Sequence, residues 1–436
     1  MVNNNLTSLL NGKRLLSPEI GILHHISKLP RVSGDPFQVG YGVWPCNNLP
    51  LGGEKYGGQS SGVGYGWENA LLGTMGETVE RYSSTFINTD NLIKSSYKNL
   101  KEPAIHPSEF ALFHEKQYKL YREKKISFVP FNEDTEVYWD KSYDLTSGKT
   151  VLCPCEHIYM PFEGRTNYRI SATSTTGLSS HTNFYKAILT SIYEIIERDS
   201  FVLTWMQNIP APKITITSEI QEYLNKFYPK HYEWHFIDIT YDLNIPTVFG
   251  ICIGEAEFGK FIAIGASSRG TYSEALKKTI SEIGQAVPYF RYMLDGKKKS
   301  KPIANFYEIN SFDEHAIFYT TRPDLIHVFD IWRKKEPQKI IDFNENLSRS
   351  DREQILYMAK ILKDKGYNFL VNDLTTPDVN QAKFYVLRVV VPQLLLLSGA
   401  YGLYFSGGKR LYEVPEKFGY KTFDFDNLNS FPHPFP

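Results

Sequence analysis

The chain has 436 residues, of which 42% are hydrophobic, and its 48 basic and 48 acidic residues balance to zero net charge. A chain of this length can bury a large core and form two or three domains. The balanced charge supplies no basic field for nucleic acid, so we expect no nucleic-acid partner. Four cysteines are too sparse for a disulfide framework, and we expect ordinary buried thiols.

Three segments repeat one layout, a turn rich in glycine or serine followed by a helix-like run that ends in polar residues. They read SSGVGYGWENALLGTMGETVERYSS, RISATSTTGLSSHTNFYKAILTSIYEIIERDSF and FIAIGASSRGTYSEALKKTISEIGQAV. An alanine lies seven residues before the first acid of each copy, at Ala70, Ala187 and Ala275. The acid and the polar residue three positions later form the pairs Glu77 and Glu80, Glu194 and Glu197, and Glu282 and Gln285. Because residues three and seven apart share a helix face, the pattern predicts three helices in register.

Strands are predicted before the second and third of these helices, where residues 168–175 and 261–266 are alternating or apolar. Further strands are predicted at residues 234–239, 247–253, 369–371 and 386–391. Strand, small-residue turn and helix therefore recur as a unit, and the sum is a mixed α/β fold. We expect an N-terminal segment over residues 1–60 and a catalytic domain over residues 61–436.

The most apolar stretch covers residues 386–405, but it contains Arg388 and Pro392 and is split by Gly399 and Gly402. A membrane span of this length should be free of such breaks, so we expect two buried strands around a turn. The N-terminus lacks the basic start and apolar run of a signal peptide. We therefore expect no membrane association and a cytoplasmic location.

The paired acids have two interpretations. They can be solvated side chains balanced by the arginines that follow them, Arg81 and Arg198. Alternatively they converge on a site, where two charges about 4 Å apart repel by roughly 4 kcal/mol at an effective dielectric of about 20. Mg²⁺ relieves such repulsion, because it takes oxygen ligands and bridges acids to phosphates. Two copies in register favour a magnesium–nucleotide site, although no P-loop or kinase motif is present.

These blocks resemble the YcaO family. GETVER matches the first helix of the family, SATSTTG followed by SIYEIIERD matches the second block, and EALKKTISEIGQ matches the third. The resemblance extends from roughly residue 20 to the end, and it implies a YcaO-like fold with the repeated units around a central nucleotide site that binds ATP and Mg²⁺. The implied metal ligands are Glu77, Glu80, Glu194 and Glu197. The implied phosphate and nucleotide contacts are Arg81, Arg198, Thr173, Ser174, Thr176, Glu282 and Gln285.

Two positions depart from the family pattern. Thr176 stands where the family often has asparagine before the glycine of the second block, and Tyr289 stands where an arginine is common in the third block. Arg291 lies nearby and is a candidate replacement for that arginine.

The chain ends in SFPHPFP, which places Pro432, Pro434 and Pro436 at alternate positions. Proline restricts the backbone to an extended form, so such an end can enter a groove at little entropic cost. A disordered end is the other interpretation from composition alone. With the YcaO blocks present, the tail resembles that of azoline-forming cyclodehydratases, in which it aids ring formation. We expect it to add little to any core, so its deletion should leave stability unchanged.

The resemblance implies the D-type subunit of an ATP-dependent cyclodehydratase that converts Cys, Ser or Thr of a ribosomal precursor peptide to thiazoline or oxazoline. Arg198 and the three tail prolines are its implied catalytic residues. Implied partners are the precursor peptide, an E1-like leader-binding companion protein and a dehydrogenase, and a homodimer is expected. Two alternatives stay open: a YcaO enzyme that forms thioamides or amidines, and an inactive ATP-binding scaffold.

Overall fold

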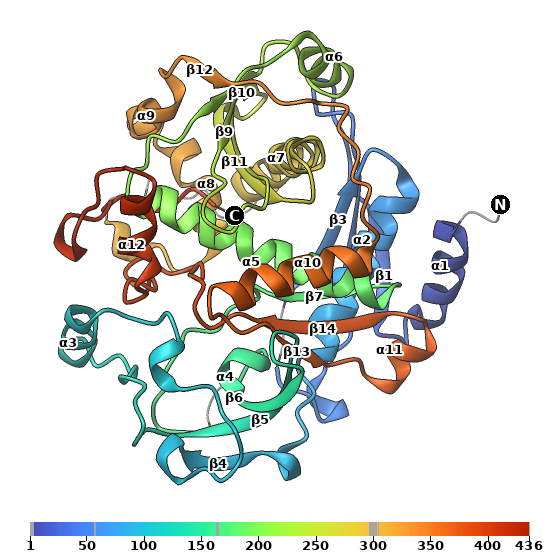
Figure 1. Ribbon diagram of the computed structural model, residues 1–436. Helices are drawn as coiled ribbons and strands as arrows, with labels where there is room; N and C mark the ends of the chain where they lie inside the picture. The colour runs from blue at the N-terminus through green and yellow to red at the C-terminus, as the bar shows by residue number, and fades with distance from the viewer. Residues whose placement is uncertain (1–3, 56–57, 163–164, 296–302, 304, 436) are drawn as a thin grey trace. The chain divides into compact units, whose positions relative to one another are not determined.

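The computed structural model describes residues 4–55, 58–162, 165–295, 303 and 305–435 (Figure 1). The chain divides into two compact units, each assembled from segments that are distant in sequence. Unit 1 consists of Met1–Pro30, Val39–Ile195 and Arg349–Leu394, and unit 2 consists of Arg31–Gln38, Ile196–Ser348 and Leu395–Pro436. The boundary falls inside helix α5 (Phe184–Met206), so this helix belongs to unit 1 in its first half and to unit 2 in its second.

Unit 1 contains a small antiparallel sheet in the order β1-β2-β3. Its strands are β1 (Leu23–Lys28), β2 (Val39–Pro45) and β3 (Ser60–Gly64). Helix α2 (Trp67–Ser83) packs on β2 and β3, and α1 (Asn4–Gly12) lies beside α2 (Figure 1). Glycine at position 62 permits this close approach, because a Cβ atom there would lie 2.3 Å from the backbone nitrogen of Thr74.

The second sheet of unit 1 is antiparallel in the order β4-β5-β13-β14-β7, and β6 pairs with β5. Its strands are β4 (Ile93–Ser96), β5 (Glu136–Asp144), β6 (Lys149–Pro154), β7 (Leu178–His181), β13 (Leu370–Asp373) and β14 (Tyr385–Val390). Helix α2 also packs on β7 and β14, which places it between the two sheets. Its buried residues Met75, Val79 and Tyr82 join a core with Leu178 and Val386.

In the described part of unit 1, further helices are α3 (Glu115–Glu123), α4 (Cys155–Ile158), α10 (Asp351–Asp364) and α11 (Pro377–Gln381). The short helix α4 packs on β5, β6 and β14. This contact brings the end of α4 next to the centre of β14, where a charged side chain is buried.

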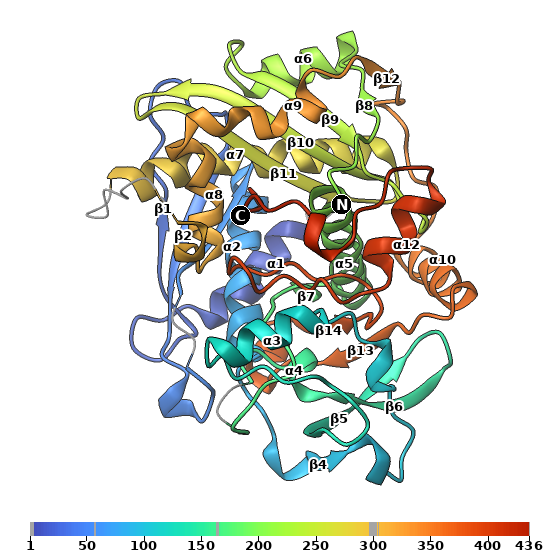
Figure 2. The same cartoon turned by 90° about the vertical axis from the view of Figure 1, so that its left-hand side faces the viewer.

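Unit 2 is built on one sheet in the order β11-β10-β9-β8-β12, which is antiparallel except between β8 and β12. Its strands are β8 (Lys213–Ile214), β9 (Glu233–Asp238), β10 (Thr247–Ala256), β11 (Gly259–Ser268) and β12 (Pro337–Lys339). Helix α7 (Tyr272–Asp295) runs along β10 and β11 (Figures 1 and 2), and the Thr279 hydroxyl donates to the Val248 carbonyl at 3.1 Å. Phe249 contacts Phe201 of α5 and Trp332, with ring centroids 5.4 and 5.6 Å away.

The remaining helices of unit 2 are α6 (Ser218–Phe227), α8 (Phe312–Thr321), α9 (Asp330–Arg333) and α12 (Arg410–Lys417). Arg410 is buried and forms ion pairs with Asp199 at 2.7 Å and Asp242 at 2.9 Å. Asp199 also accepts the backbone N–H of Leu395, so this charged group fixes α5 to α12 and to the segment before it.

The mixed α/β fold predicted from the sequence is confirmed, and the three in-register helices are α2, α5 and α7. The strand predicted at residues 168–175 is wrong, because only Arg169 makes an isolated bridge there and β7 begins at Leu178, after a turn. A second strand after β14 was also a wrong expectation, since residues 391–405 form turns and coil. In the parts of the chain that the structure describes, no helix is long and apolar enough to cross a membrane.

Candidate active site

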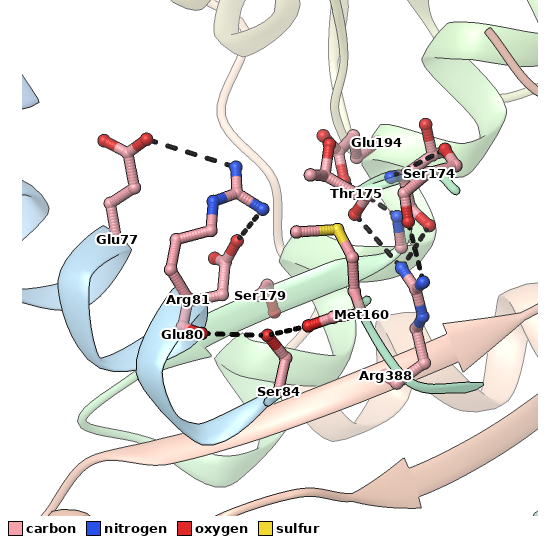
Figure 3. Close-up of polar contacts among 12 residues, drawn as sticks. Glu77, Glu80, Arg81, Ser84, Met160, Ser174, Thr175, Ser179, Glu194 and Arg388 are labelled. Carbon is pink, nitrogen blue, oxygen red and sulfur yellow. Dashed lines mark hydrogen bonds and ion pairs between the residues drawn. The ribbon is translucent and has the colours of Figure 1, made fainter. Parts of the chain in front are cut away.

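Helix α2 positions three of the predicted residues on one face. Arg81 contacts the carboxylate of Glu80 at 3.0 Å and reaches that of Glu77 at 4.0 Å (Figure 3). Glu77 also accepts the backbone N–H of Ser61 in β3 at 3.0 Å. In the first Glu-x-x-Glu-Arg segment (ExxER, residues 77–81), one guanidinium therefore binds two carboxylates. The backbone of β3 fixes the position of the Glu77 carboxylate.

In the second repeat, Glu194 likewise accepts a backbone N–H from the turn that precedes its helix. The backbone N–H of Gly177 donates to the Glu194 carboxylate at 2.9 Å. Gly177 has a φ of +85°, and a Cβ atom there would lie 2.4 Å from the carbonyl oxygen of Val389, so glycine is required. In both repeats, the strand or turn before the helix thus caps the first glutamate with a backbone N–H.

The third repeat keeps this placement without the hydrogen bond. A Cβ atom at Gly265 of β11 would lie 3.5 Å from the Cβ of Glu282, so strand and helix meet at the same point as in the other copies. Glu282 instead forms an ion pair with Lys278 at 3.2 Å, one turn earlier on α7. The repeat seen in the sequence is therefore also a structural repeat, with a diverged third copy.

Arg388 is a residue of this site that the sequence interpretation missed. It lies on β14 with only 2% of its surface exposed, and it donates to the carbonyl of Ile158 at the end of α4 at 3.1 Å. It also donates to the carbonyls of Ser174, Thr175 and Thr176, at 2.7, 3.2 and 2.9 Å (Figure 3). The signal available in the sequence is a single charge inside an otherwise apolar strand.

The predicted nucleotide contacts of the second block lie in the loop above Arg388. Thr173 is exposed, and its hydroxyl accepts from Arg169 at 3.1 Å. Ser174 is half-buried, and its hydroxyl accepts the backbone N–H of Thr176 at 3.2 Å. Thr176 is buried, so its side chain faces the protein rather than solvent.

The electrostatics of unit 1 indicate an excess of negative charge at this site. Burial raises the pKa of the Glu80 carboxyl to about 8, and repulsion from Glu194 and Glu77 adds to this, while Arg81 opposes it. Burial lowers the pKa of the Arg388 guanidinium to about 10, and attraction to Glu194 and Glu80 opposes that shift. Three carboxylates thus face two guanidiniums, and a further cation would stabilise the ionised form of Glu80.

The donor set fits a hard divalent cation, since its atoms are carboxylate oxygens. Within residues 4–55, 58–162, 165–295, 303 and 305–435, no group of three or more His, Cys, Asp or Glu side chains forms a ready-made metal cage. Mg²⁺ rarely needs one, because it keeps several waters and binds through one or two carboxylates together with nucleotide phosphates.

Unit 2 contains the other predicted residues. On α5, Glu197 is 5% exposed and pairs with Arg198 at 3.5 Å. On α7, Gln285 lies three residues after Glu282. Arg291, the candidate replacement for the missing arginine, is instead held by the carboxylates of Asp35 and Glu257. Its guanidinium therefore serves an ion-pair network of unit 2.

The C-terminal tail is part of the core of unit 2. The Tyr319 hydroxyl donates to the carbonyl of Pro432 at 2.7 Å, and Pro434 is buried. His433 stacks on His315 with ring centroids 3.7 Å apart, and Phe435 is 2% exposed. The expectation that the tail adds little to any core is therefore wrong. The other interpretation, that the tail is a disordered end, is also wrong. Pro436 lies outside the described residues.

The tail also touches the second ExxER helix within unit 2. The Arg198 guanidinium lies 3.8 Å from the centroid of the Phe435 ring, a distance typical of a cation–π contact. Phe201, one turn further along α5, packs on the same ring at 4.7 Å. The end of the chain and the predicted phosphate-binding arginine are therefore physically coupled.

The fold and the acidic helices define an ATP- and Mg²⁺-binding class of enzyme. The model of the YcaO cyclodehydratase family, described as ATP- and Mg²⁺-binding, matches residues 61–395. The chain belongs to this family, which confirms the resemblance and the predicted cofactors, ATP and Mg²⁺. A search of curated proteins found no match.

Solved structures share the fold at low sequence identity. A heterocyclase in complex with substrate and cofactor has a TM-score of 0.76 and 20% identity, and the match covers 99% of this chain and 57% of that one. The heterocyclase TruD has a TM-score of 0.62 and 20% identity, with 83% and 50% covered. YcaO from Methanopyrus kandleri, bound with AMPPCP and Mg²⁺, has a TM-score of 0.62 and 13% identity, with 91% of each chain covered. The chain thus spans about half the length of the two heterocyclases.

Proposed function

We propose that this chain is the ATP- and Mg²⁺-dependent subunit of a peptide cyclodehydratase. It would phosphorylate a backbone amide oxygen so that Cys, Ser or Thr of a ribosomal precursor peptide becomes thiazoline or oxazoline. The observation that carries the proposal is the glutamate–arginine arrangement of α2 and α5, which lies inside the region matched by the family model. We further propose that it acts in the cytoplasm.

The chemistry follows from a poor leaving group. When the substrate thiol or hydroxyl attacks the preceding carbonyl carbon, the carbonyl oxygen must depart before a C=N bond can form. Bound ATP supplies the phosphoryl group that lets this oxygen leave as phosphate, so the peptide loses one water in total. The residues of the chain position the phosphates and neutralise their charge, which is the main protein contribution in phosphoryl transfer.

We assign individual roles on this basis. Glu77, Glu80 and Glu194 are proposed metal ligands of unit 1, because their oxygens carry more negative charge than the neighbouring arginines balance. Arg81 is proposed to bind phosphate. The remaining proposed assignments are Glu197 as a metal ligand, and Arg198, Thr173, Ser174, Thr176, Glu282 and Gln285 as nucleotide contacts.

The tail is proposed to act in ring formation through Pro432, Pro434, Pro436 and Arg198. Support comes from the contact between Arg198 and Phe435, which gives the tail a fixed position beside an arginine of the ExxER motif. The burial of residues 432–435 holds the proline segment in one conformation.

Partners are also proposed. We infer that a precursor peptide is presented by an E1-like leader-binding companion protein, and that a dehydrogenase and a second copy of this chain take part. Support comes from the E. coli microcin synthetase McbBCD complex, whose fold matches with a TM-score of 0.60 and 16% identity. A second structure of that complex has pro-MccB17 bound and a TM-score of 0.59.

The fate of the amide oxygen tests the proposed chemistry. A peptide that the enzyme cyclises is prepared with heavy oxygen in the carbonyl before the reacting residue, and the products are analysed by mass spectrometry. The label is expected in inorganic phosphate, with one water lost per ring. Ring formation with the label in water would refute amide phosphorylation, and sulfur or nitrogen uptake without ring closure would favour the thioamide or amidine alternative.

A further inference from the structure

Every hydrogen bond that the Arg388 guanidinium makes among the described residues goes to a main-chain carbonyl. One acceptor is Ile158, and the other three are the consecutive carbonyls of residues 174–176. A buried arginine usually faces a carboxylate, because desolvating an unpaired cation is expensive. Here Glu80 and Glu194 act on Arg388 only through longer-range attraction. The fold thus keeps a buried charge with three of its four hydrogen bonds on one loop and the fourth on the end of α4.

The three carbonyls determine which way the loop presents its polar groups. In a trans peptide unit the C=O and the following N–H point in opposite directions. With the carbonyls of residues 174–176 directed to Arg388, the N–H groups of residues 175–177 point away from it. The N–H of Gly177 accordingly donates to Glu194, on the side of the acidic helices. The N–H of Thr176 donates within the loop, to the Ser174 hydroxyl at 3.2 Å. Arg388 therefore holds the loop with the N–H of Gly177 directed at Glu194, a proposed metal ligand.

We propose that Arg388 is the positioning residue of the nucleotide site, which fixes the conformation of residues 174–177 and supplies a permanent positive charge beneath them. This inference rests on the proposed function. An apolar residue would fill the same buried volume at lower electrostatic cost, but it would leave three consecutive carbonyls without a common donor. Lysine would keep the charge, but its single ammonium cannot match the planar fork that spans several acceptors.

The first measurement needs no nucleotide. Hydrogen exchange is compared in wild type, Arg388→Gln and Leu387→Ala. Leu387 is the matched control, because it is equally buried on the same strand while its side chain points to the opposite face of the sheet. Arg388→Gln is expected to speed exchange at residues 174–177 by at least tenfold relative to Leu387→Ala. Equal exchange at these amides in the two variants would overturn the inference, whatever the chemistry of the enzyme.

The second measurement separates charge from geometry by titrating a non-hydrolysable Mg–ATP analogue into each variant. Arg388→Gln is expected to weaken analogue binding at least tenfold and to raise KM for ATP more than it lowers kcat, while Arg388→Lys recovers part of the affinity. Leu387→Ala should lose thermal stability but keep wild-type affinity. Equal affinity in Arg388→Gln and wild type would overturn the positioning role. Failure of wild type to bind the analogue would instead refute the proposed function.

Discussion

Gly177 shows how the conformation of one residue fixes the turn of the second repeat against the Glu194 carboxylate. Its left-handed conformation turns the chain sharply before β7, and its N–H reaches Glu194 at 2.9 Å. Its own carbonyl accepts the N–H of Val389 at 2.7 Å, so the turn is also tied to β14. The geometry of the proposed site therefore depends on a residue that has no side chain.

We expect Gly177→Ala to lower the free energy of unfolding by at least about 1–2 kcal/mol, the cost of a left-handed residue with a Cβ atom. The clash with the Val389 carbonyl at 2.4 Å adds to this. The change should also weaken Mg–ATP binding, because the turn must shift away from Glu194. Denaturant unfolding and calorimetry provide the two readouts.

Gly148 provides the matched control for that change. It also has a positive φ, +70°, and lies in unit 1, but the nearest atom to an added Cβ is 4.0 Å away. Gly148→Ala should therefore lose stability without losing nucleotide affinity. If both variants bind Mg–ATP like wild type, the turn at Gly177 has no role in the site.

At the residue scale, the helical spacing predicted correctly that Glu77, Glu80 and Arg81 share one face of α2, where Arg81 contacts both carboxylates. Their roles in metal and phosphate binding stay predictions. Arg388 could not be assigned in that way, since its partners are distant in sequence: the turn at residues 174–176 meets it through the pairing of β14 with β7, and Ile158 through the packing of α4 on β14.

At the scale of elements, the tail is the clearest departure from the sequence-based expectation. A pattern of alternate prolines indicates an extended backbone but says nothing about what covers it. The structure covers residues 432–435 with aromatic side chains of α5 and α8, including Trp205, which donates to the carbonyl of Phe431 at 3.1 Å. Burial of this kind is a tertiary property, so composition alone favoured the wrong interpretation.

Phe435→Ala is therefore expected to destabilise unit 2 by about 3–5 kcal/mol, which is typical when a buried phenylalanine is truncated. Phe418→Ala, at a ring that is 44% exposed, is the control and should have a smaller effect. Thermal or denaturant unfolding compares the two variants. A tail that docks only transiently would leave both variants close to wild type.

The loop at residues 168–175 is a second instructive case. Its alternating side chains are typical of a strand, yet the Glu156 carboxylate accepts the backbone N–H groups of Ile170 and Ser171, and Arg388 binds the Ser174 carbonyl. As a result, β7 starts only after Gly177. These side chains satisfy backbone groups that a strand would pair with its neighbours. By contrast, the long apolar strands β10 and β14 were predicted close to their observed bounds, because burial on both faces gives a strong signal.

At the scale of the whole molecule, buried histidines set the response to acid. Burial lowers the pKa of His315 to about 4, against the opposing effect of its hydrogen bond to the His433 carbonyl. Burial also lowers the pKa of His433 well below its usual value, and the neighbouring His315 ring and Arg198 lower it further. Their neutral rings bond to carbonyls: His315 to that of His433 at 2.7 Å, and His433 to that of Ser398 at 2.8 Å. Protonation would place two cations in contact beside Arg198.

Stability should therefore fall as the pH drops below about 6.5, the ordinary pKa of histidine. Between about 6.5 and 4 the unfolded chain binds a proton at His315 that the folded chain does not, so the free energy of unfolding falls by about 1.4 kcal/mol per pH unit for this group. Denaturant unfolding across this range, in wild type and His315→Gln, isolates the contribution. A variant with the same pH slope as wild type would show that the pair is not responsible.

The most direct test of the proposed site is calorimetric titration of Mg–ATP into wild type, Glu80→Ala and Glu68→Ala. Glu68 lies in the first turn of the same helix and serves as the control. Glu80→Ala should weaken binding roughly 10- to 100-fold, equivalent to about 1.5–3 kcal/mol for a lost charged interaction. Its melting temperature should stay the same or rise, because a desolvated carboxylate is removed. Wild-type affinity in folded Glu80→Ala, or an equal loss in Glu68→Ala, would contradict a magnesium–nucleotide site on α2.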